Sequence, residues 1–148
     1  MIANIAITSG RWQALQQPLI EVRTVVFIEE QHVPTDIEWD ALDAGAIHLL
    51  ALNEDEKAIG CARILNVNSP DGIARIGRMA VLKDWRGCGL GRQLLDKGIE
   101  ICRQQNVKTI AISSQTHAIK FYQQAGFVVT SDAYIDANIW HVDMALTL

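Results

Sequence analysis

Residues 79–95 read MAVLKDWRGCGLGRQLL, and this stretch limits most strongly what the chain can fold into. A short apolar run is followed by three glycines, Gly87, Gly89 and Gly91, and a helical pattern starts near Leu90. Glycine gives up side-chain packing, so a chain places it where a turn or a close-approaching ligand needs a backbone without a Cβ. The stretch therefore predicts a strand, a glycine loop and a helix in succession, which is a unit of an α/β fold.

The composition is that of an ordinary globular protein, and we expect a single domain over residues 1–148. Apolar residues make up 49% and charged residues 20%, which excludes wholesale disorder. The net charge of −4 argues against a basic face for phosphates, so we expect no nucleic-acid partner. No stretch approaches the ~20 apolar residues of a membrane span, and we expect a cytoplasmic protein without a membrane partner. The three cysteines show no CxxC spacing, so neither a disulfide framework nor a metal site is predicted.

Hydrophobic periodicity and turn residues place the other elements. Strands are expected at residues 2–8, 46–53, 58–67, 73–82, 107–114, 127–132 and 137–148. Helices are expected at residues 18–31, 90–105 and 116–127. This order predicts a central sheet flanked by helices, with the short apolar run at 107–114 in the interior of the sheet.

Several residues define the ends and faces of these elements. Ser9 and Gly10 are expected to close the first strand, and Pro18 suits the first turn of a helix, with residues 12–17 as an earlier segment that it kinks. Gly126 should end the last helix in a left-handed conformation. Alternation in the last strand is expected to turn four side chains toward the core: Trp140, Val142, Met144 and Leu146.

The glycine loop and its arginines are typical of an anion-binding site. Backbone N–H groups at the start of a helix, with the positive end of its dipole, suit a phosphate or pyrophosphate. Arg86 and Arg92 flank the loop with positive charge. The loop lacks the lysine and hydroxyl of a triphosphate-binding GxxxxGK motif, and GxGxxG fails because Arg92 stands at its last glycine. A flexible turn between strand and helix is the alternative that the loop alone leaves open.

A second motif narrows the interpretation. The loop fits the pattern RxxGxG, and SQTHAIKFYQQAGF follows at residues 114–127. Together the two motifs resemble the Gcn5-related N-acetyltransferase (GNAT) superfamily, which binds acetyl-CoA. The resemblance implies the GNAT fold, a mixed and mostly antiparallel sheet flanked by helices, and it implies that Tyr122 is the acid that protonates the departing thiolate. The residues implied to hold acetyl-CoA are Met79, Ala80 and Val81 for the pantetheine arm and Arg86, Gly87, Cys88, Gly89, Leu90, Gly91 and Arg92 for the pyrophosphate.

A narrower resemblance, to the ElaA-like acetyltransferases, covers nearly the whole chain. Gln115 stands where the wider superfamily often has an asparagine, and ElaA-like members share this glutamine, so it is also expected at the cofactor. The segments that carry the resemblance are VVFIEEQ (25–31), EWDALD (38–43), AIHLLA (46–51), GCARIL (60–65), IGRMAV (76–81), SQTHA (114–118) and WHVDM (140–144).

Candidates for the base come from the same segments. Glu30 stands at the characteristic Glu-Gln of FIEEQ, so it is expected either to bind the acceptor or to act as the base, although glutamates at a helix end commonly face solvent. His117 and His141 lie in segments expected near the acceptor, and histidine is a base near neutral pH. A structural or surface role is the alternative for each histidine.

The connection at 33–45 carries four acidic side chains. Two interpretations stay open: the carboxylates attract a cationic amine, or they form a solvated loop. The residues are Asp36, Glu38, Asp40 and Asp43.

We therefore expect acetyl-CoA-dependent transfer of an acetyl group to the primary amine of a small molecule or peptide, directly within a ternary complex. A covalent route through Cys88 is disfavoured because nothing in the loop pairs that thiol with a base. Two alternatives stay open: a non-catalytic acyl-CoA-binding or sensor module on the same fold, and an enzyme similar to the acyl-homoserine-lactone synthases. Nothing in the sequence determines the oligomeric state, and a homodimer stays open.

Overall fold

Strands and helices follow one another in the order expected of the α/β class. The structure is a computed structural model and describes residues 4–148. Its strands are β1 (Ala6–Gly10), β2 (Ile47–Leu52), β3 (Ala58–Leu65), β4 (Ile73–Val81), β5 (Thr109–Gln115), β6 (Val128–Val129), β7 (Tyr134–Asp136) and β8 (Ile139–Thr147). Its helices are α1 (Trp12–Arg23), α2 (Thr35–Glu38), α3 (Leu90–Gln104) and α4 (Ile119–Gln124), with a π-helix at Thr24–Glu30 and single 3-10 turns at Asp43–Gly45, Lys83–Trp85 and Thr116–Ala118.

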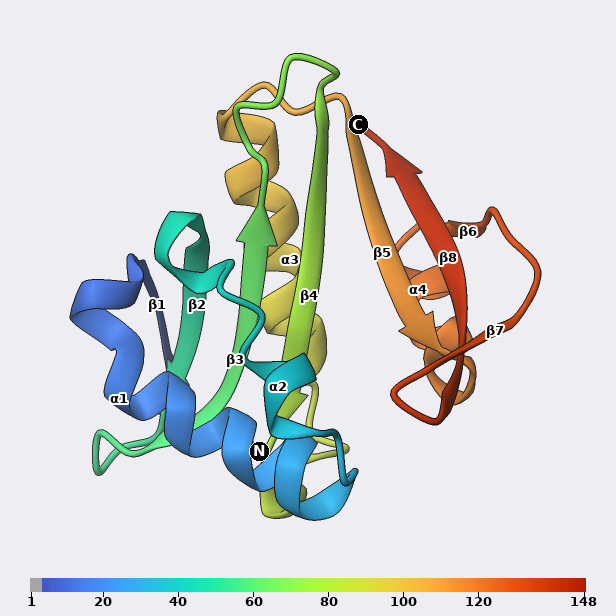
Figure 1. Ribbon diagram of the computed structural model, residues 1–148. Coiled ribbons are helices and arrows are strands. Elements are labelled where there is room, and N and C mark those ends of the chain that lie inside the picture. The colour runs from blue at the N-terminus through green and yellow to red at the C-terminus, as the bar shows by residue number, and fades with distance from the viewer. Residues whose placement is uncertain (1–3) are drawn as a thin grey trace.

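Alternating apolar side chains give the sheet two covered faces. On β2, Leu49 and Ala51 join a cluster with the buried side of α3, whereas Leu50 joins a second cluster with α1 and the π-helix. Residues two apart on a strand share a face, so each face of the sheet packs against a helix. Figure 1 shows α1 in front of the sheet and α3 behind it.

The eight strands of the described residues form one mixed sheet. Their order is β1-β2-β3-β4-β5-β8-β6, and β7 pairs with β8. Every pair is antiparallel except β4 with β5. The predicted fold class, a mixed and mostly antiparallel sheet flanked by helices, is confirmed.

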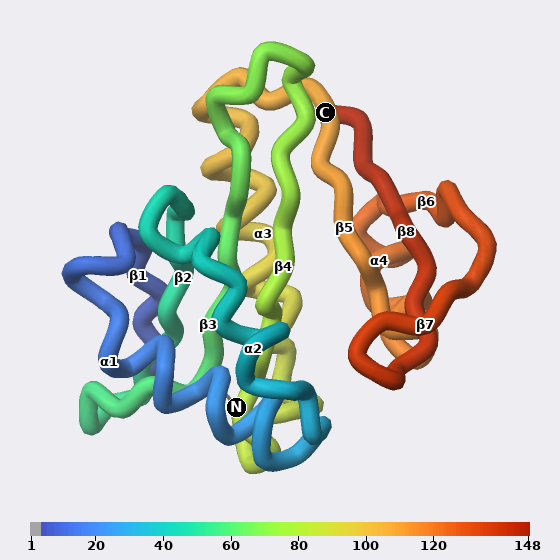
Figure 2. The backbone as a smooth tube through the Cα atoms, viewed as in Figure 1, coloured from blue at the N-terminus to red at the C-terminus, as the bar shows by residue number. Residues whose placement is uncertain are grey.

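The parallel pair in the middle of the sheet is short. We call it the seam: β4 and β5 pair at three positions only, the last being Arg75 with Ala111. Beyond the seam β4 continues to Val81 and β5 continues to Gln115, and the two strands diverge, as Figures 1 and 2 show. We call these continuations, residues 76–81 and 112–115, the arms. On their facing sides they border a gap where a sheet would normally have a neighbouring strand.

A bulge lies in the arm of β4. Cys61 pairs with Ala80 and Arg63 pairs with Gly77, so β4 has one more residue than β3 in this interval. Arg78 absorbs the difference with a φ of 49°, in the left-handed region that residues other than glycine mostly avoid. Bulges bend a strand and re-aim its side chains, and this one lies in the arm that borders the gap.

The first helix differs from the prediction. Pro18 lies inside α1 and not in the first turn of a helix, so α1 includes residues 12–17 and lacks one helical hydrogen bond at the proline. The helical path then continues as a π-helix to Glu30. Its wider turn is not described by the 3.6-residue period on which the prediction rests.

The first strand is also displaced. Ser9 and Gly10 belong to β1 and pair with Leu49 and His48, so they do not close the strand as predicted. Residues 2–3 of the predicted strand lie outside the described residues.

The C-terminal part is more finely divided than predicted. The helix expected at 116–127 is a 3-10 turn followed by α4, and the strand expected at 127–132 is reduced to β6. An additional strand, β7, forms a hairpin with β8 through Ala137 and Asn138, which have φ values of 50° and 62°. Two left-handed residues are typical of a tight hairpin, but the usual glycine is missing. Trp140 is 55% exposed and not in the core, whereas Val142 and Met144 are buried as expected.

Candidate active site

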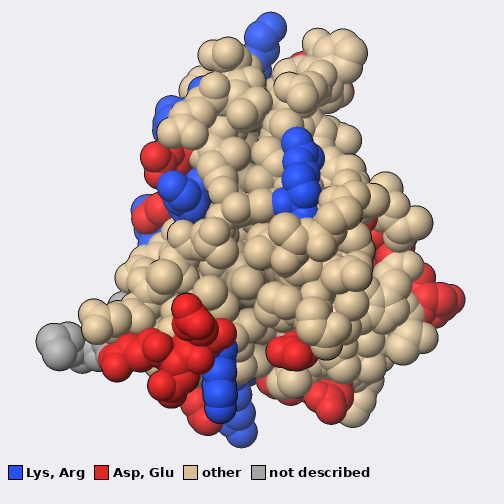
Figure 3. All heavy atoms as spheres, turned by 90° about the vertical axis from the view of Figure 1, so that its left-hand side faces the viewer, with Lys and Arg blue, Asp and Glu red and all other residues tan. Residues whose placement is uncertain are grey.

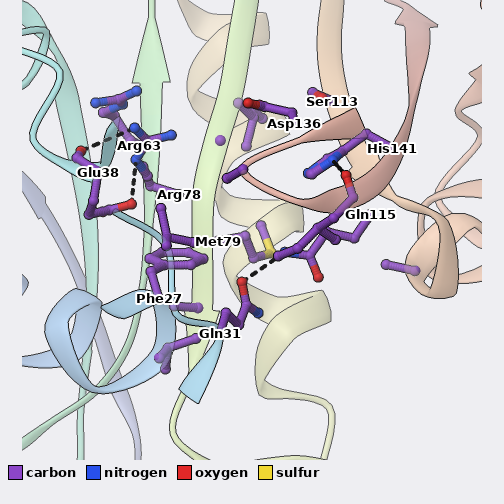
Figure 4. Close-up of a pocket in the computed structure, with 18 of the residues that line it drawn as sticks. Phe27, Gln31, Glu38, Arg63, Arg78, Met79, Ser113, Gln115, Asp136 and His141 are labelled. Carbon is purple, nitrogen blue, oxygen red and sulfur yellow. Dashed lines mark hydrogen bonds and ion pairs between the residues drawn. The ribbon is translucent and has the colours of Figure 1, made fainter. Parts of the chain in front are cut away.

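The diverging arms open a cleft of about 840 Å³. Its walls are the π-helix with the connection that follows it, β3, β4 with its arm, the arm of β5, α4, and the hairpin of β7 and β8. Met79 and Gln115 each lie four residues beyond the last pair of the seam, and His141 pairs with Gln115. These three residues therefore lie at a common level, where Figure 4 shows them around the cleft.

The glycine loop meets the cleft where β4 ends. Val81, Arg86 and Gly91 line the cleft, and Gly87 and Gly89 have φ values of 77° and 88°. Gly89 directly precedes α3, and no side chain of residues 4–148 caps this helix. The N–H groups of its first turn are therefore free of intrahelical partners. A Cβ on Gly91 would lie 3.5 Å from Phe121, an ordinary contact, so packing within the protein does not require glycine there. The close approach of a ligand would require glycine at this position.

Arg86 connects the loop to the N-terminal half of the chain. Its Nε donates to the carbonyl oxygen of Val81 at 2.8 Å, and its Nη2 donates to both carboxylate oxygens of Glu30 at 3.1 and 2.9 Å. Both side chains are partly exposed. Glu30 is thus engaged by Arg86, and it is not among the residues that line the cleft.

Three side chains form a hydrogen-bonded chain across the cleft. Gln115 Nε2 donates to Gln31 Oε1 at 2.9 Å, and His117 Nε2 donates to Gln115 Oε1 at 2.7 Å. An amide oxygen can only accept, so His117 carries its proton on Nε2. The chain joins the segment after the π-helix to the end of β5, as Figure 4 shows for the two glutamines.

Tyr122 lies on α4 and lines the cleft. Its ring packs edge-on against Phe121 and Phe127, at centroid distances of 5.0 and 5.8 Å. Burial raises the pKa of its hydroxyl to about 12. The hydroxyl is therefore protonated throughout the physiological range, which keeps it a proton donor.

His141 is held from two directions. Its Nδ1 donates to the carbonyl oxygen of Ile139 at 2.7 Å, and its ring stacks on Tyr134 at 5.9 Å. Tyr134 in turn donates its hydroxyl to Asp143 Oδ1 at 2.6 Å and contacts Ser113 Oγ. A carbonyl can only accept, so Nδ1 carries the proton and the neutral ring keeps a lone pair on Nε2. His141 lines the cleft and is 9% exposed.

The acidic connection is not a solvated loop. Three of its four carboxylates are paired with three arginines from α1, β3 and β4. Glu38 is 2% exposed and its Oε2 accepts from Arg23 Nε at 2.6 Å, while Arg78 Nε lies 3.1 Å from its Oε1. Asp43, 7% exposed, accepts from Arg23 at 2.7 Å and from Arg63 at 3.1 Å.

Asp40 is the third carboxylate of this group, which we call the ion-pair cluster: Arg23, Glu38, Asp40, Asp43, Arg63 and Arg78. Its two oxygens accept from Arg63 at 2.9 Å each, and Oδ2 also accepts from Arg78 at 3.0 Å. Asp36, by contrast, is exposed, with no ion pair among residues 4–148. The solvated-loop interpretation is therefore wrong for Glu38, Asp40 and Asp43, and the pairing of these three carboxylates is unfavourable for the attraction of a cationic amine.

The pKa values of the cluster follow from burial and from the arginines. Burial opposes ionisation of all three acids. For Asp40 burial is outweighed by the sum of its contacts with Arg63, the backbone N–H of Leu42 and the charge of Arg78, and its pKa falls to about 2. Hydrogen bonds from Arg23 and Arg63 likewise lower the pKa of Asp43 below its ordinary value. For Glu38 burial prevails over the arginines, and its pKa is raised.

The outer surface on the side of α1 and β1 carries little positive charge. In Figure 3, Lys and Arg side chains stand singly on this face, and acidic side chains gather along its lower edge. A nucleic acid needs a continuous basic surface, and the described residues visible in this view do not form one.

The structure brings most of the predicted site residues to one place. Of the residues expected at acetyl-CoA, the following line the cleft: Met79, Ala80, Val81, Arg86, Gly91 and Gln115. The others belong to the loop or to the first turn of α3, and there Leu90 is buried, so only its backbone is available. Arg92 forms an ion pair with Asp96, with 2.9 Å between Nε and Oδ1. Among the expected catalytic residues, Tyr122, His117 and His141 line the cleft.

Several residues of the cleft have no clear signal in the sequence. Gln31 stands out there only as the end of FIEEQ, and its contact with Gln115 depends on a π-helix that periodicity does not reveal. Ser113 and Asp136 stand in segments without a chemical pattern. Arg75 is one of two arginines in the strand IARIGRMAV, and the strand pattern alone assigns it no role.

The comparisons with known proteins agree with this geometry. A family model described as "Acetyltransferase (GNAT) domain" matches residues 16–148. The chain belongs to the GNAT acetyltransferase family. The protein ElaA of Escherichia coli is 34% identical over 129 residues, which are 86% of this chain and 84% of ElaA. A UPF0039 protein of Schizosaccharomyces pombe is 36% identical over 129 residues, with the same two shares.

Solved structures support the same assignment. The crystal structure of E. coli ElaA matches with a TM-score of 0.86 at 28% identity, covering 96% of this chain and 99% of that one. An acyl-CoA N-acyltransferase from Pseudomonas aeruginosa matches with the same values. The GNAT fold and the resemblance to ElaA-like proteins, both expected from the motifs, are confirmed.

Two further properties of this GNAT domain concern the described residues only. Among residues 4–148, His, Cys, Asp and Glu side chains do not gather in groups of three or more that would hold a metal ion. In the same part of the chain, every helix is too short or too polar to span a membrane.

Proposed function

We propose that this GNAT protein transfers an acetyl group from acetyl-CoA to a primary amine, directly within a ternary complex. The observation that carries the proposal is the pair of diverging arms that ends beside the glycine loop. The arms offer backbone groups for an extended chain that carries amides, and the loop offers N–H groups for a pyrophosphate at the end of that chain. When bound, acetyl-CoA supplies the acetyl group as an activated thioester.

The residues of this chain fit such a cofactor. Met79, Ala80 and Val81 are the end of the β4 arm, and this end would pair with pantetheine. Gly87 and Gly89 hold the loop in left-handed conformations, and Gly91 leaves room where a Cβ would project. A backbone N–H of the arm can also polarise the carbonyl group of the thioester, a contribution of the oxyanion type.

We assign the acid role to Tyr122. Its side chain lines the cleft, and its pKa of about 12 keeps the hydroxyl protonated and available as a donor. As the C–S bond breaks, the hydroxyl donates a hydrogen bond to the sulfur that gains negative charge and passes its proton to that sulfur. The edge-on contacts with Phe121 and Phe127 fix the direction of the ring.

We assign the base role to His141, with Glu30 and His117 as the alternatives to be tested. His141 lines the cleft, and its bond to Ile139 leaves the lone pair of Nε2 for a proton of the incoming amine. Glu30 has less support because Arg86 occupies both of its oxygens. His117 uses its Nε2 to hold Gln115 and keeps only Nδ1 as an acceptor.

The cysteines do not support a covalent route. Cys88 donates its thiol to the carbonyl oxygen of Trp85 at 2.9 Å and has no base in contact among the described residues. Burial raises the pKa of Cys61 to about 12 and that of Cys102 to about 11, so both stay thiols. Direct transfer needs none of the three.

A mass-spectrometric screen of amine acceptors with acetyl-CoA tests the proposal. We expect an acetylated amine and one equivalent of free CoA for each turnover, with Tyr122→Phe as the impaired variant. Tight CoA binding with no acetylated product across the panel would instead identify a non-catalytic acyl-CoA-binding module. Release of a lactone from S-adenosylmethionine would identify an enzyme similar to the acyl-homoserine-lactone synthases.

A further inference from the structure

The carboxylates beside the cleft are already used by the protein. Both oxygens of Asp40 accept from arginines, and Oδ1 also accepts the backbone N–H of Leu42 at 3.1 Å. Glu38 is enclosed between Arg23 and Arg78. An acceptor with several positive charges would therefore find no free carboxylate in this ion-pair cluster.

One arginine of the cleft is not paired with a carboxylate of the described residues. Arg75 lines the cleft, is exposed, and has no ion pair among residues 4–148. It is the last residue of the seam, so its side chain projects from the point at which β4 and β5 begin to diverge. Arg75 pairs with Leu65, and Gly77 pairs with Arg63. Because paired residues, and residues two apart on one strand, share a face of the sheet, the side chains of Arg75 and Arg63 lie on the same face.

The surface between Arg75 and the level of Met79 is open. Gly77, two residues after Arg75 and about 7 Å along the strand, lines the cleft, and a Cβ there would meet nothing within 4 Å. Across the cleft, Asp136 at the end of β7 is exposed and likewise has no ion pair among the described residues. Two unpaired charges of opposite sign thus face one cleft without contacting each other.

We infer that the acceptor is an amine that also carries an acidic group, a carboxylate or a phosphate, and that Arg75 binds this group. The inference rests on the proposed function, because it places the amine at the level of His141 and Met79 and the acidic group toward the seam. A guanidinium suits this task, since it binds carboxylate or phosphate with two parallel hydrogen bonds. Asp136 on the opposite wall attracts the ammonium form as it enters.

The test uses matched pairs of amines that differ in one acidic group. ω-Amino acids of increasing length are compared with their primary amides, and O-phosphoethanolamine is compared with ethanolamine. Binding to the CoA-saturated protein is measured by calorimetry, and kcat/KM with acetyl-CoA is measured separately. We expect the acidic member of at least one pair to bind better by roughly 10- to 100-fold, the usual range for a hydrogen bond between charged groups.

Two variants with the same substitution locate the effect. Arg75→Gln should remove the preference for the acidic member and leave the binding of the neutral member unchanged. Arg103→Gln, an exposed position in the last turn of α3, should leave the preference intact. A wild-type protein that binds acid and amide equally would overturn the inference, as would a preference that survives in Arg75→Gln.

The two readouts separate the inference from the function on which it rests. Acidic amines that bind through Arg75 but are never acetylated would refute the acetyltransferase and leave the recognition of an acidic group standing. Amines that are acetylated without any preference for an acidic group would refute the recognition and leave the acetyltransferase standing.

Discussion

The pairing of Asp40 with Arg63 and Arg78 gives a quantitative expectation for Asp40→Asn. The pKa of Asp40 is about 2 against 3.8 for a free side chain, because burial, which opposes ionisation, is outweighed by the two arginines together with the backbone N–H of Leu42. A tenfold change in acidity corresponds to about 1.4 kcal/mol, so the carboxylate contributes about 2 kcal/mol to the free energy of unfolding. The folded-state pKa is the lower one. The contribution is therefore fully present above pH ~4 and is lost as the pH falls through about 2.

Urea unfolding followed by circular dichroism measures this difference. We expect Asp40→Asn to lose about 2 kcal/mol of unfolding free energy at pH 7 and about half of that at pH 3. Asp36→Asn is the matched control, because Asp36 is exposed on the same connection, and it should change stability by less than about 0.5 kcal/mol. Equal losses for the two variants, or a loss that is the same at pH 7 and pH 3, would refute the reasoning.

The same variant distinguishes pairing from steering. A carboxylate that steers a cationic acceptor acts at long range, so its removal raises KM at low salt and the effect fades as salt screens the charges. Because Arg63 and Arg78 already neutralise Asp40, we expect no such salt-dependent rise in Asp40→Asn. A KM that rises at low salt and recovers at high salt would restore the steering interpretation.

Three further predictions concern the site. Gly89→Val should lower the affinity for CoA far more than Gly45→Val, because Gly89 has a φ of 88° whereas a Cβ on Gly45 would meet nothing within 4 Å among the described residues. Isothermal titration with CoA and with pantetheine checks that only the affinity for CoA falls. Tyr122→Phe should lower kcat by ~10²–10⁴-fold and leave the affinity for acetyl-CoA unchanged. Because the pKa of Tyr122 is about 12, the wild-type rate should not decline with rising pH below about pH 11. A decline near pH ~9 that disappears in Tyr122→Phe would contradict the acid role. His141→Gln should lower kcat most near neutral pH, where an imidazole can accept a proton and little hydroxide or free amine replaces it, whereas Glu30→Gln should keep the wild-type pH profile; a Glu30→Gln defect that grows toward low pH returns the base role to Glu30.

The parts of the fold that were predictable depend on local pattern. The stripe of α3, with Leu90, Leu94, Gly98 and Ile101 all buried, follows from helical spacing. Gly126 ends the last helical segment with a φ of 99°, as its lack of a Cβ allows. These signals are contained in a few neighbouring residues, so a single sequence suffices to detect them.

The parts that were not predictable depend on contacts between distant segments. Glu38 and Asp43 look like a solvated loop in the sequence, because the arginine that they share, Arg23, is 15 and 20 residues away. The hairpin of β7 and β8 has no sequence signal because its turn, Ala137-Asn138, lacks the glycine that marks such turns. The ranking of the base candidates likewise required the structure, since only the bond of His141 to Ile139 shows which ring nitrogen is free.

The diverging arms leave unpaired strand edges inside the sheet, whereas a sheet normally has such edges only at its two sides. Here two edges face each other in the interior, beyond the seam that ends at Arg75. Exposed edges pair readily with extended chains, and the proposed cofactor is such a chain, so bound acetyl-CoA would pair with the two edges as an added strand does. The protein should then be held together in part by its own substrate, with a gain of about 2.7 kcal/mol in unfolding free energy at a hundredfold excess over Kd. Those backbone amides of the arms that point into the gap should report this directly, by exchanging hydrogen quickly in the free protein and slowly in the complex.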